Sequence, residues 1–337
     1  MKTNELVSKA KDRYEEQLKR VESFLKDPKK NAKRKRVFQA FSSSFFRYAF
    51  LIGLSFVILF PTIQQILQAL RAPQDVNNPA VIWIPEIWST LNIKLAIGVL
   101  DYKDAALNTA FLSVVSMLLQ IFATSLAGYS FSRLKTKFSN ILFILVILTI
   151  VIPPQALSLS QYLYFRNLNL IGTPWAIVLM NLLGMGIRSG IFIFIFRQFF
   201  AGLPKELEES AQIDGAGVFR TFFSVMLPNA RGAMVTVGLF SFVWAWNDAY
   251  SVKIFEVSTE KFPILTMRLI NAAENMKAQL FYEGMLDLVG QDVWENPLFL
   301  ALISNVSALL MMLPLLIMYL FVQRLFVESI ERTGIVG

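Results

Sequence analysis

The chain has 337 residues, of which 55% are hydrophobic and only 17% charged, and its formal net charge is +8. A soluble protein of this length would carry more charge and could not bury so much apolar surface, so the composition indicates a polytopic membrane protein. Cysteine and histidine are both absent. Disulfides, thiolate metal sites and histidine proton shuttles are therefore excluded, and an intramembrane enzyme would depend on carboxylates alone.

The N-terminal segment, residues 1–45, is strongly basic and has no pattern of a cleavable signal peptide. Residues 1–36 hold thirteen lysines and arginines against six acidic residues, with the densest cluster at Lys33–Arg36. Nucleic-acid binding is one interpretation of such a run. We favour a cytoplasmic anchor that precedes the first membrane helix and attracts anionic lipid headgroups.

Within this segment, apolar residues recur at helical spacing until Pro28 stops the pattern. They are Val7, Ala10, Tyr14, Leu18, Val21 and Leu25. The pattern predicts an amphipathic helix in the cytoplasm or on the membrane surface. A marginal helix without a partner fits the same residues.

Six apolar segments reach the length of about 20 residues that crosses the hydrocarbon core. They are 46–69, 106–131, 138–162, 174–198, 229–252 and 297–322. The predicted organisation has a first transmembrane helix at 46–69, an extracytoplasmic loop at 70–105, a membrane core at 106–325 and a cytoplasmic tail at 326–337. The fold class is therefore an all-α polytopic membrane protein with six transmembrane helices.

The distribution of lysine and arginine predicts the orientation. With the N-terminus inside, 23 of these residues lie in inner segments and eight in outer ones, whereas acidic residues divide evenly, 12 against 11. Such a bias follows the positive-inside rule. Both termini and the polar segment near residue 210 are therefore expected in the cytoplasm.

A charged stretch, Leu203–Gly217, interrupts the apolar pattern of the core. Each charge placed at the bilayer centre would cost about 2.5–3.5 kcal/mol, so the stretch must lie in water. Pro204 suits the first position of a helix, and the glutamates after it favour the positive end of its dipole. Asp214-Gly215 predicts the helix end. We expect a short helix lying across the membrane plane, with a return to the bilayer at Leu227-Pro228.

The spacing of this stretch resembles a known family signature. Glu209-Ser-Ala211, three residues, Gly215, nine residues and Val225-Met-Leu-Pro228 resemble the EAA motif of binding-protein-dependent ABC importer permeases. Leu203–Leu207 and Ile213–Ala216 resemble its carbohydrate branch, the relatives of the maltose permease of the G type. Leu126–Arg133, which closes the second span, and Trp246-Asn-Asp248 match as well. Ser210 departs from the alanine that is usual in the family.

The resemblance implies a type I importer (MetI-like) fold and a set of partners. These are a second permease subunit, two cytoplasmic ATPase subunits and an extracytoplasmic solute-binding protein. The chain has no GxxxxGK[ST] phosphate loop. We therefore expect that it is not an enzyme and binds no cofactor, and that the ATPase subunits bind ATP and Mg. The residues expected to couple to the ATPases lie in the coupling loop, 200–228: Glu206, Glu209, Ser210, Ala211, Asp214 and Gly215. A solvated connector without a partner is the alternative.

Other residues are candidates for a substrate path. Arg188 falls within the fourth span, in the small-xxx-small pattern Gly186–Gly190. It either faces the path or forms an ion pair or hydrogen bond to a neighbouring helix or the partner permease. Trp246, Asn247 and Asp248, near Trp244, could bind a sugar by stacking and hydrogen bonds, although tryptophan is also common in interfacial belts. The phenylalanines of the fourth span are expected to face lipid or another subunit: Phe192, Phe194, Phe196, Phe199 and Phe200.

Two other classes of function fit the sequence less well. A secondary transporter or channel would need intramembrane carboxylates or inverted repeats, and the spans offer only Asp248 near a boundary. An intramembrane enzyme lacks paired carboxylates in any span. Within the importer class, the cargo is expected to be a carbohydrate, and a peptide, a polyamine or another polar solute is the alternative.

Overall fold

The structure is a computed structural model that describes residues 13–19, 28–79, 81, 83–134, 137–282, 284 and 296–334. It divides the chain into two units, Met1–Gln64 and Gln65–Gly337. The described residues form helices and turns, and their only β feature is an isolated antiparallel bridge between Arg71 and Trp88. The predicted all-α fold class is therefore confirmed.

The first unit consists mainly of a long apolar helix. The helix α2 (Pro28–Ala69) has 42 residues and continues into the second unit, so it begins well before residue 46, where the first span was predicted. Its window of highest hydropathy has no buried residue. A helix that is apolar all round needs a lipid or protein cover.

The predicted amphipathic helix is only partly described. Residues 13–19 are helical, and Tyr14 and Leu18 lie one turn apart with both side chains exposed. Val7, Ala10, Val21 and Leu25 lie outside the described residues.

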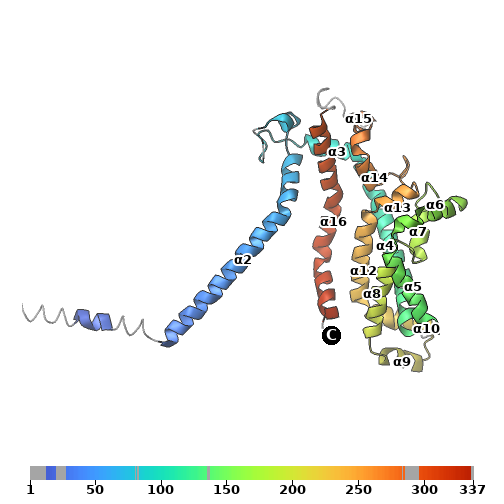
Figure 1. Cartoon of the computed structure of the whole chain (residues 1–337), viewed down its shortest axis with the longest axis horizontal. Helices are drawn as coiled ribbons and strands as arrows, with labels where there is room; N and C mark the ends of the chain where they lie inside the picture. The colour runs from blue at the N-terminus through green and yellow to red at the C-terminus, as the bar shows by residue number, and fades with distance from the viewer. Residues whose placement is uncertain are drawn as a thin grey trace, which may run out of the picture. The chain divides into compact units, whose positions relative to one another are not determined.

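The second unit contains the remaining elements (Figure 1). In chain order they are η1 (Pro73–Asn77), α3 (Leu91–Leu100), α4 (Tyr102–Arg133), α5 (Ser139–Val151), η2 (Pro154–Leu157), α6 (Ser158–Asn167), α7 (Trp175–Leu182), α8 (Ser189–Gly202), α9 (Glu206–Ile213), α10 (Val218–Thr221), the π-helix η3 (Phe222–Met226), α11 (Leu227–Asn229), α12 (Arg231–Trp246), α13 (Ala249–Ile254), α14 (Leu265–Ile270), α15 (Ala272–Tyr282) and α16 (Pro297–Gly334).

Several of the predicted spans are not single straight helices. Three described helices are long and apolar enough to cross a membrane: Phe38–Ala69, Tyr102–Arg133 and Pro297–Leu325. A fourth candidate is the pair Ser139–Val151 and Pro154–Asn167, bent by 103° at its proline break. The predicted span 174–198 is divided between α7 and α8, and 229–252 between α12 and the shorter helices beside it.

The helix α4 is the centre of the second unit, because it packs against both α8 and α12. Gly128 lies at its contact with α8: a Cβ built on it would lie 2.6 Å from Phe196 Cβ and 2.8 Å from the Arg197 backbone nitrogen. Gly190 lies at the contact between α8 and α5 in the same way: a Cβ built on it would lie 2.6 Å from Thr149 Oγ1. Small residues that let helix backbones approach are typical of membrane helix packing.

A buried group of aromatic side chains fills the space between α4, α8 and η3. We call it the aromatic core, and it consists of Tyr129, Phe192, Phe196, Phe200 and Phe222. The expectation that the phenylalanines of the fourth span face lipid or another subunit is therefore wrong for three of them. Phe192, Phe196 and Phe200 are fully buried within the chain itself, and Phe194 remains 39% exposed.

Candidate functional site

The predicted short helix after the fourth span is present as α9 (Glu206–Ile213). It lies crosswise to α8 and α12, beyond the end of α8 (Figure 1). The helix begins two residues later than Pro204, which had been expected at its first position. Pro204 acts on the preceding residue instead: Leu203 is extended, with φ −73° and ψ 144°, and this break separates α9 from α8.

The end of α9 is closed by a complete Schellman motif. The amide of Ala216 donates to the Ala211 carbonyl at 2.9 Å, and the amide of Gly215 donates to the Gln212 carbonyl at 3.0 Å. Gly215 has φ +78°, a conformation that glycine adopts without the steric cost of a Cβ. The predicted turn at Asp214-Gly215 is therefore confirmed in its position and in its physical cause.

The predicted coupling residues divide between two faces of α9. Five of them are exposed: Glu206, Glu209, Ser210, Asp214 and Gly215. Ala211 is 7% exposed and lies against the protein's own chain. The exposed face of α9 is thus polar and acidic, and Ala211 belongs to its inner face.

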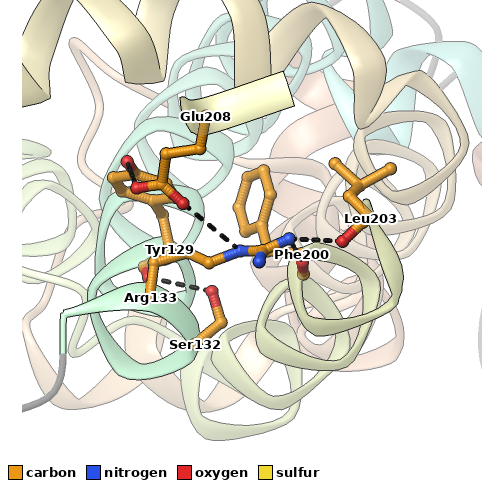
Figure 2. A network of polar contacts seen from close by, with 6 residues as sticks. All are labelled: Tyr129, Ser132, Arg133, Phe200, Leu203 and Glu208. Carbon is orange, nitrogen blue, oxygen red and sulfur yellow. Dashed lines mark hydrogen bonds and ion pairs between the residues drawn. The ribbon is translucent and has the colours of Figure 1, made fainter. Parts of the chain in front are cut away.

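A polar network joins the inner face of α9 to the end of α4 (Figure 2). The Tyr129 hydroxyl donates to Glu208 Oε1 at 2.8 Å, and Arg133 Nε lies 3.7 Å from Glu208 Oε2. These three residues were not among the predicted site residues. Tyr129 and Arg133 stand one helical turn apart in α4, which lets both reach one carboxylate.

Apolar side chains continue the exposed surface beyond α9. Ile213 is 86% exposed, and Phe219, in the short helix α10, is 68% exposed. Val218 and Phe223 are also exposed. An acidic helix beside exposed aromatic and aliphatic groups is typical of a protein interface.

A second candidate region is the break between α7 and α8, where Arg188 lies. Arg188 has φ +59° and precedes the first residue of α8, so it stands in a left-handed turn and not in the middle of a helix. Its guanidinium carbon lies 5.6 Å from the centroid of the Trp244 ring. The partner of Arg188 in the structure is thus an aromatic ring of α12, a cation–π contact, and the side chain stays exposed.

Buried amides hold this break against α4. The Asn181 amide donates to Ser116 Oγ at 2.9 Å, and the Gln120 amide donates to the Ile187 carbonyl at 3.1 Å. Gly186 leaves room for this arrangement, because a Cβ at that position would lie 1.8 Å from Asn181 Oδ1. Of the two glycines in the predicted small-xxx-small pattern, Gly190 therefore allows close helix packing, whereas Gly186 leaves room for the Asn181 side chain at the break.

Comparison with known proteins identifies the family. Residues 120–332 match the model of the binding-protein-dependent transport system inner membrane component. This match covers more than half of the chain. The chain belongs to this family of permeases.

Several relatives resemble the permease over most of its length. The arabinooligosaccharides transport system permease protein of Halalkalibacterium halodurans is 26% identical, over 84% of this chain and 93% of that protein. The melibiose/raffinose/stachyose import permease protein of Bacillus subtilis is 28% identical, over 80% and 88%. A chain from the crystal structure of a bacterial ABC transporter involved in the import of the acidic polysaccharide alginate matches with a TM-score of 0.67, at 18% identity, over 86% of this chain and 96% of that chain. The match to that structure supports the predicted permease fold.

The remaining candidates for a substrate path occupy different environments in the permease. Trp246 is 2% exposed and donates its indole N–H to the Met311 carbonyl at 3.1 Å, so it packs against α16 and not in an interfacial belt. Asn247 is exposed, and its amide donates back to the Val243 carbonyl at 2.8 Å. Asp248 is buried and caps α13 by accepting the Ser251 amide at 2.9 Å.

Asp248 also lines a small cavity at the break, whose walls are both polar and apolar. The cavity has a volume of about 20 Å³, and its polar lining includes Ser116, Gln120 and Asn181. Such a space can hold about one water molecule. The cavity therefore brings Asp248 to the same place as the amides of the break, whereas Trp246 and Asn247 lie elsewhere.

Proposed function

We propose that this chain is the permease subunit of an ATP-driven, solute-binding-protein-dependent importer for a carbohydrate. The observation that carries the proposal is the exposed acidic helix α9, closed by Gly215 and placed within the family-matched residues. Relatives that import oligosaccharides support a carbohydrate cargo. The cargo moves by alternating access, which is a rigid-body change of the membrane helices.

The proposal assigns the other parts of the machine to partners. A second permease subunit completes the membrane pathway, and two ATPase subunits bind ATP and Mg and hydrolyse the ATP. An extracytoplasmic solute-binding protein delivers the carbohydrate. Both termini and α9 lie in the cytoplasm, in accord with the lysine and arginine bias of the sequence. The permease itself is no enzyme and holds no cofactor.

The first test concerns the docking of α9 to an ATPase. A side chain at φ +78° costs roughly 1–2 kcal/mol, so the free turn of Gly215→Val should relax to another conformation. Docking must then restore the strained turn, which should weaken binding of the ATPase subunit about 5- to 30-fold. The measurement is ATPase recovery after co-purification, together with carbohydrate uptake by cells.

Gly217→Val is the matched control. Gly217 has φ −71° and no atom within 4 Å of a built Cβ, so this variant should assemble and transport normally. Normal assembly and uptake of Gly215→Val would refute docking through α9. Ion-driven uptake without any ATPase would instead favour a secondary transporter.

A second test concerns Arg188 in the substrate path. Arg188→Gln removes the charge beside Trp244 and should lower uptake about two- to fivefold, in line with roughly 0.5–1 kcal/mol for an exposed cation–π contact. Arg188→Lys keeps the charge and should retain most of the uptake. Unchanged uptake by the glutamine variant would remove Arg188 from the path.

A further inference from the structure

We infer that Glu208, Arg133 and Tyr129 form a latch that makes α9 move as one body with α4 and α8. The inference rests on the proposed function, since it concerns how force on α9 reaches the membrane helices. The three residues are positioning residues, because they act through α9 and touch neither nucleotide nor cargo. Each contact that defines the latch is drawn in Figure 2.

Arg133 connects three helices at one point. It is the last residue of α4, and its guanidinium donates to the Phe200 carbonyl at 2.7 Å and to the Leu203 carbonyl at 2.6 Å. These carbonyls lie at the C-terminal end of α8, where carbonyls outnumber the amides that can pair with them, and Phe200 also accepts the Leu203 amide at 3.3 Å. A cation at a helix C-terminus is also favoured by the helix dipole. Arg133 therefore fixes the end of α8 to the end of α4.

The same guanidinium holds α9 through Glu208. Its Nε lies 3.7 Å from Glu208 Oε2, and the side chains of Arg133 and Glu208 are only 7% and 16% exposed. Solvent and salt screen a largely buried pair less than a surface ion pair, so this contact is stronger than an exposed one. The neighbouring Glu206 and Glu209 are exposed, so Glu208 alone of the three glutamates turns inward.

Tyr129 ties the latch to the packed interior. Its hydroxyl donates to the other oxygen of Glu208, while its ring lies 5.6 Å from the Phe200 ring and 5.3 Å from the Phe222 ring. The Glu208 carboxylate is thus held on both oxygens by one turn of α4. A pull on α9 is carried to the aromatic core instead of bending the loop at Leu203-Pro204.

The contact between Arg133 and Glu208 is an ion pair and not a hydrogen bond. Arg133 Nε is buried and forms no hydrogen bond among the described residues, and 3.7 Å is longer than a hydrogen bond.

The test uses the full transporter in proteoliposomes, with ATP hydrolysis and carbohydrate uptake measured on the same preparation. Glu208→Gln should assemble and should hydrolyse ATP at a rate within about twofold of the parent. It should move at least about fivefold less carbohydrate per ATP hydrolysed, because a factor of about five corresponds to the lower end of typical coupling free energies. Ser132→Ala is the control on α4, because Ser132 Oγ donates only to its own helix, to the Tyr129 carbonyl at 2.9 Å. This control should keep the parental ratio.

A second variant separates coupling from folding. Tyr129→Phe keeps the ring in the aromatic core and loses only the hydroxyl contact, so it should lower the same ratio, and its effect should not add to that of Glu208→Gln. A parental ratio in both variants would overturn the latch. Additive losses, or a loss of ATPase binding in Glu208→Gln, would overturn it too, since Glu208 would then act elsewhere. A parent transporter without ATP-dependent uptake would refute the proposed function instead.

Discussion

Gly128→Ala is expected to push α4 and α8 apart and to destabilise the permease strongly. The added methyl group would lie 2.6 Å from Phe196 Cβ and 2.8 Å from a backbone nitrogen of α8, and a backbone atom cannot rotate away. Overpacking of this kind costs about 1–3 kcal/mol, and a larger residue such as leucine should prevent accumulation of the protein. The measurement is the thermal unfolding midpoint of the purified transporter in detergent.

Gly202→Ala is the matched control for Gly128→Ala. Gly202 is the last residue of α8, and a Cβ built on it meets no atom within 4 Å. This variant should unfold at the parental temperature or slightly above it, because alanine loses less conformational entropy than glycine on folding. Equal midpoints for the parent and Gly128→Ala would show that the two helices are not in close contact at Gly128.

Gly186→Ala is expected to break the buried hydrogen bonds that hold the interruption of the fourth span. A Cβ there would lie 1.8 Å from Asn181 Oδ1, so the amide must turn away from Ser116 Oγ and the Ile177 carbonyl. Leaving such groups unpaired costs about 1–3 kcal/mol. The thermal unfolding midpoint of the purified transporter and the rate of carbohydrate uptake should both fall.

A double variant tests whether the two residues act through one contact. In Gly186→Ala/Asn181→Ala the obstructing oxygen is gone and Gln120 Nε2 is left as the nearest contact of the added Cβ, at 3.0 Å, so the double variant should lose much less stability relative to Asn181→Ala than Gly186→Ala loses relative to the parent. Additive destabilisation would mean that Gly186 has another role.

The helix α9 could be predicted because its signals are local. The proline, the acidic first turn and the Asp214-Gly215 end lie within Pro204–Gly215 and act on neighbouring backbone atoms. The predicted start of α9 was wrong by two residues. Pro204 was expected to be the first residue of the helix, but its effect is on Leu203, because a proline also restricts the residue before it. Which side chains of α9 turn inward depends on packing, and the buried position of Ala211 was not foreseen.

The latch could not be predicted from local spacing. Tyr129 and Glu208 are 79 residues apart, and Arg133 is 67 residues from Phe200. One signal was present: Tyr129 and Arg133 share a face at the end of the second span, within the segment that resembles the permease family. The sequence alone does not say which of the three glutamates of α9, Glu206, Glu208 or Glu209, contacts Tyr129 and Arg133.

Hydropathy located the apolar segments but not their interruptions. The break between α7 and α8 depends on positive φ angles at Gly184 and Arg188, and apolar residues on both sides hide it from a hydropathy window. Hydropathy also cannot separate a phenylalanine that faces lipid from one in a core, since both environments are apolar. The buried position of Phe196 follows from close helix packing at Gly128, and Phe192 and Phe200 are buried by the rings of Trp244, Tyr129 and Phe222; these are tertiary contacts.

The π-helix Phe222–Met226 has a consequence for the direction in which α12 presents its side chains. A π turn holds one residue more than an α turn. Each residue of an α-helix advances about 100° around the axis. The additional residue therefore changes the direction in which the side chains after it point. The direction in which Trp244 points towards Arg188, near the far end of α12, therefore depends on this wide turn together with the turn at Ala230, which has φ −88° and ψ 24°.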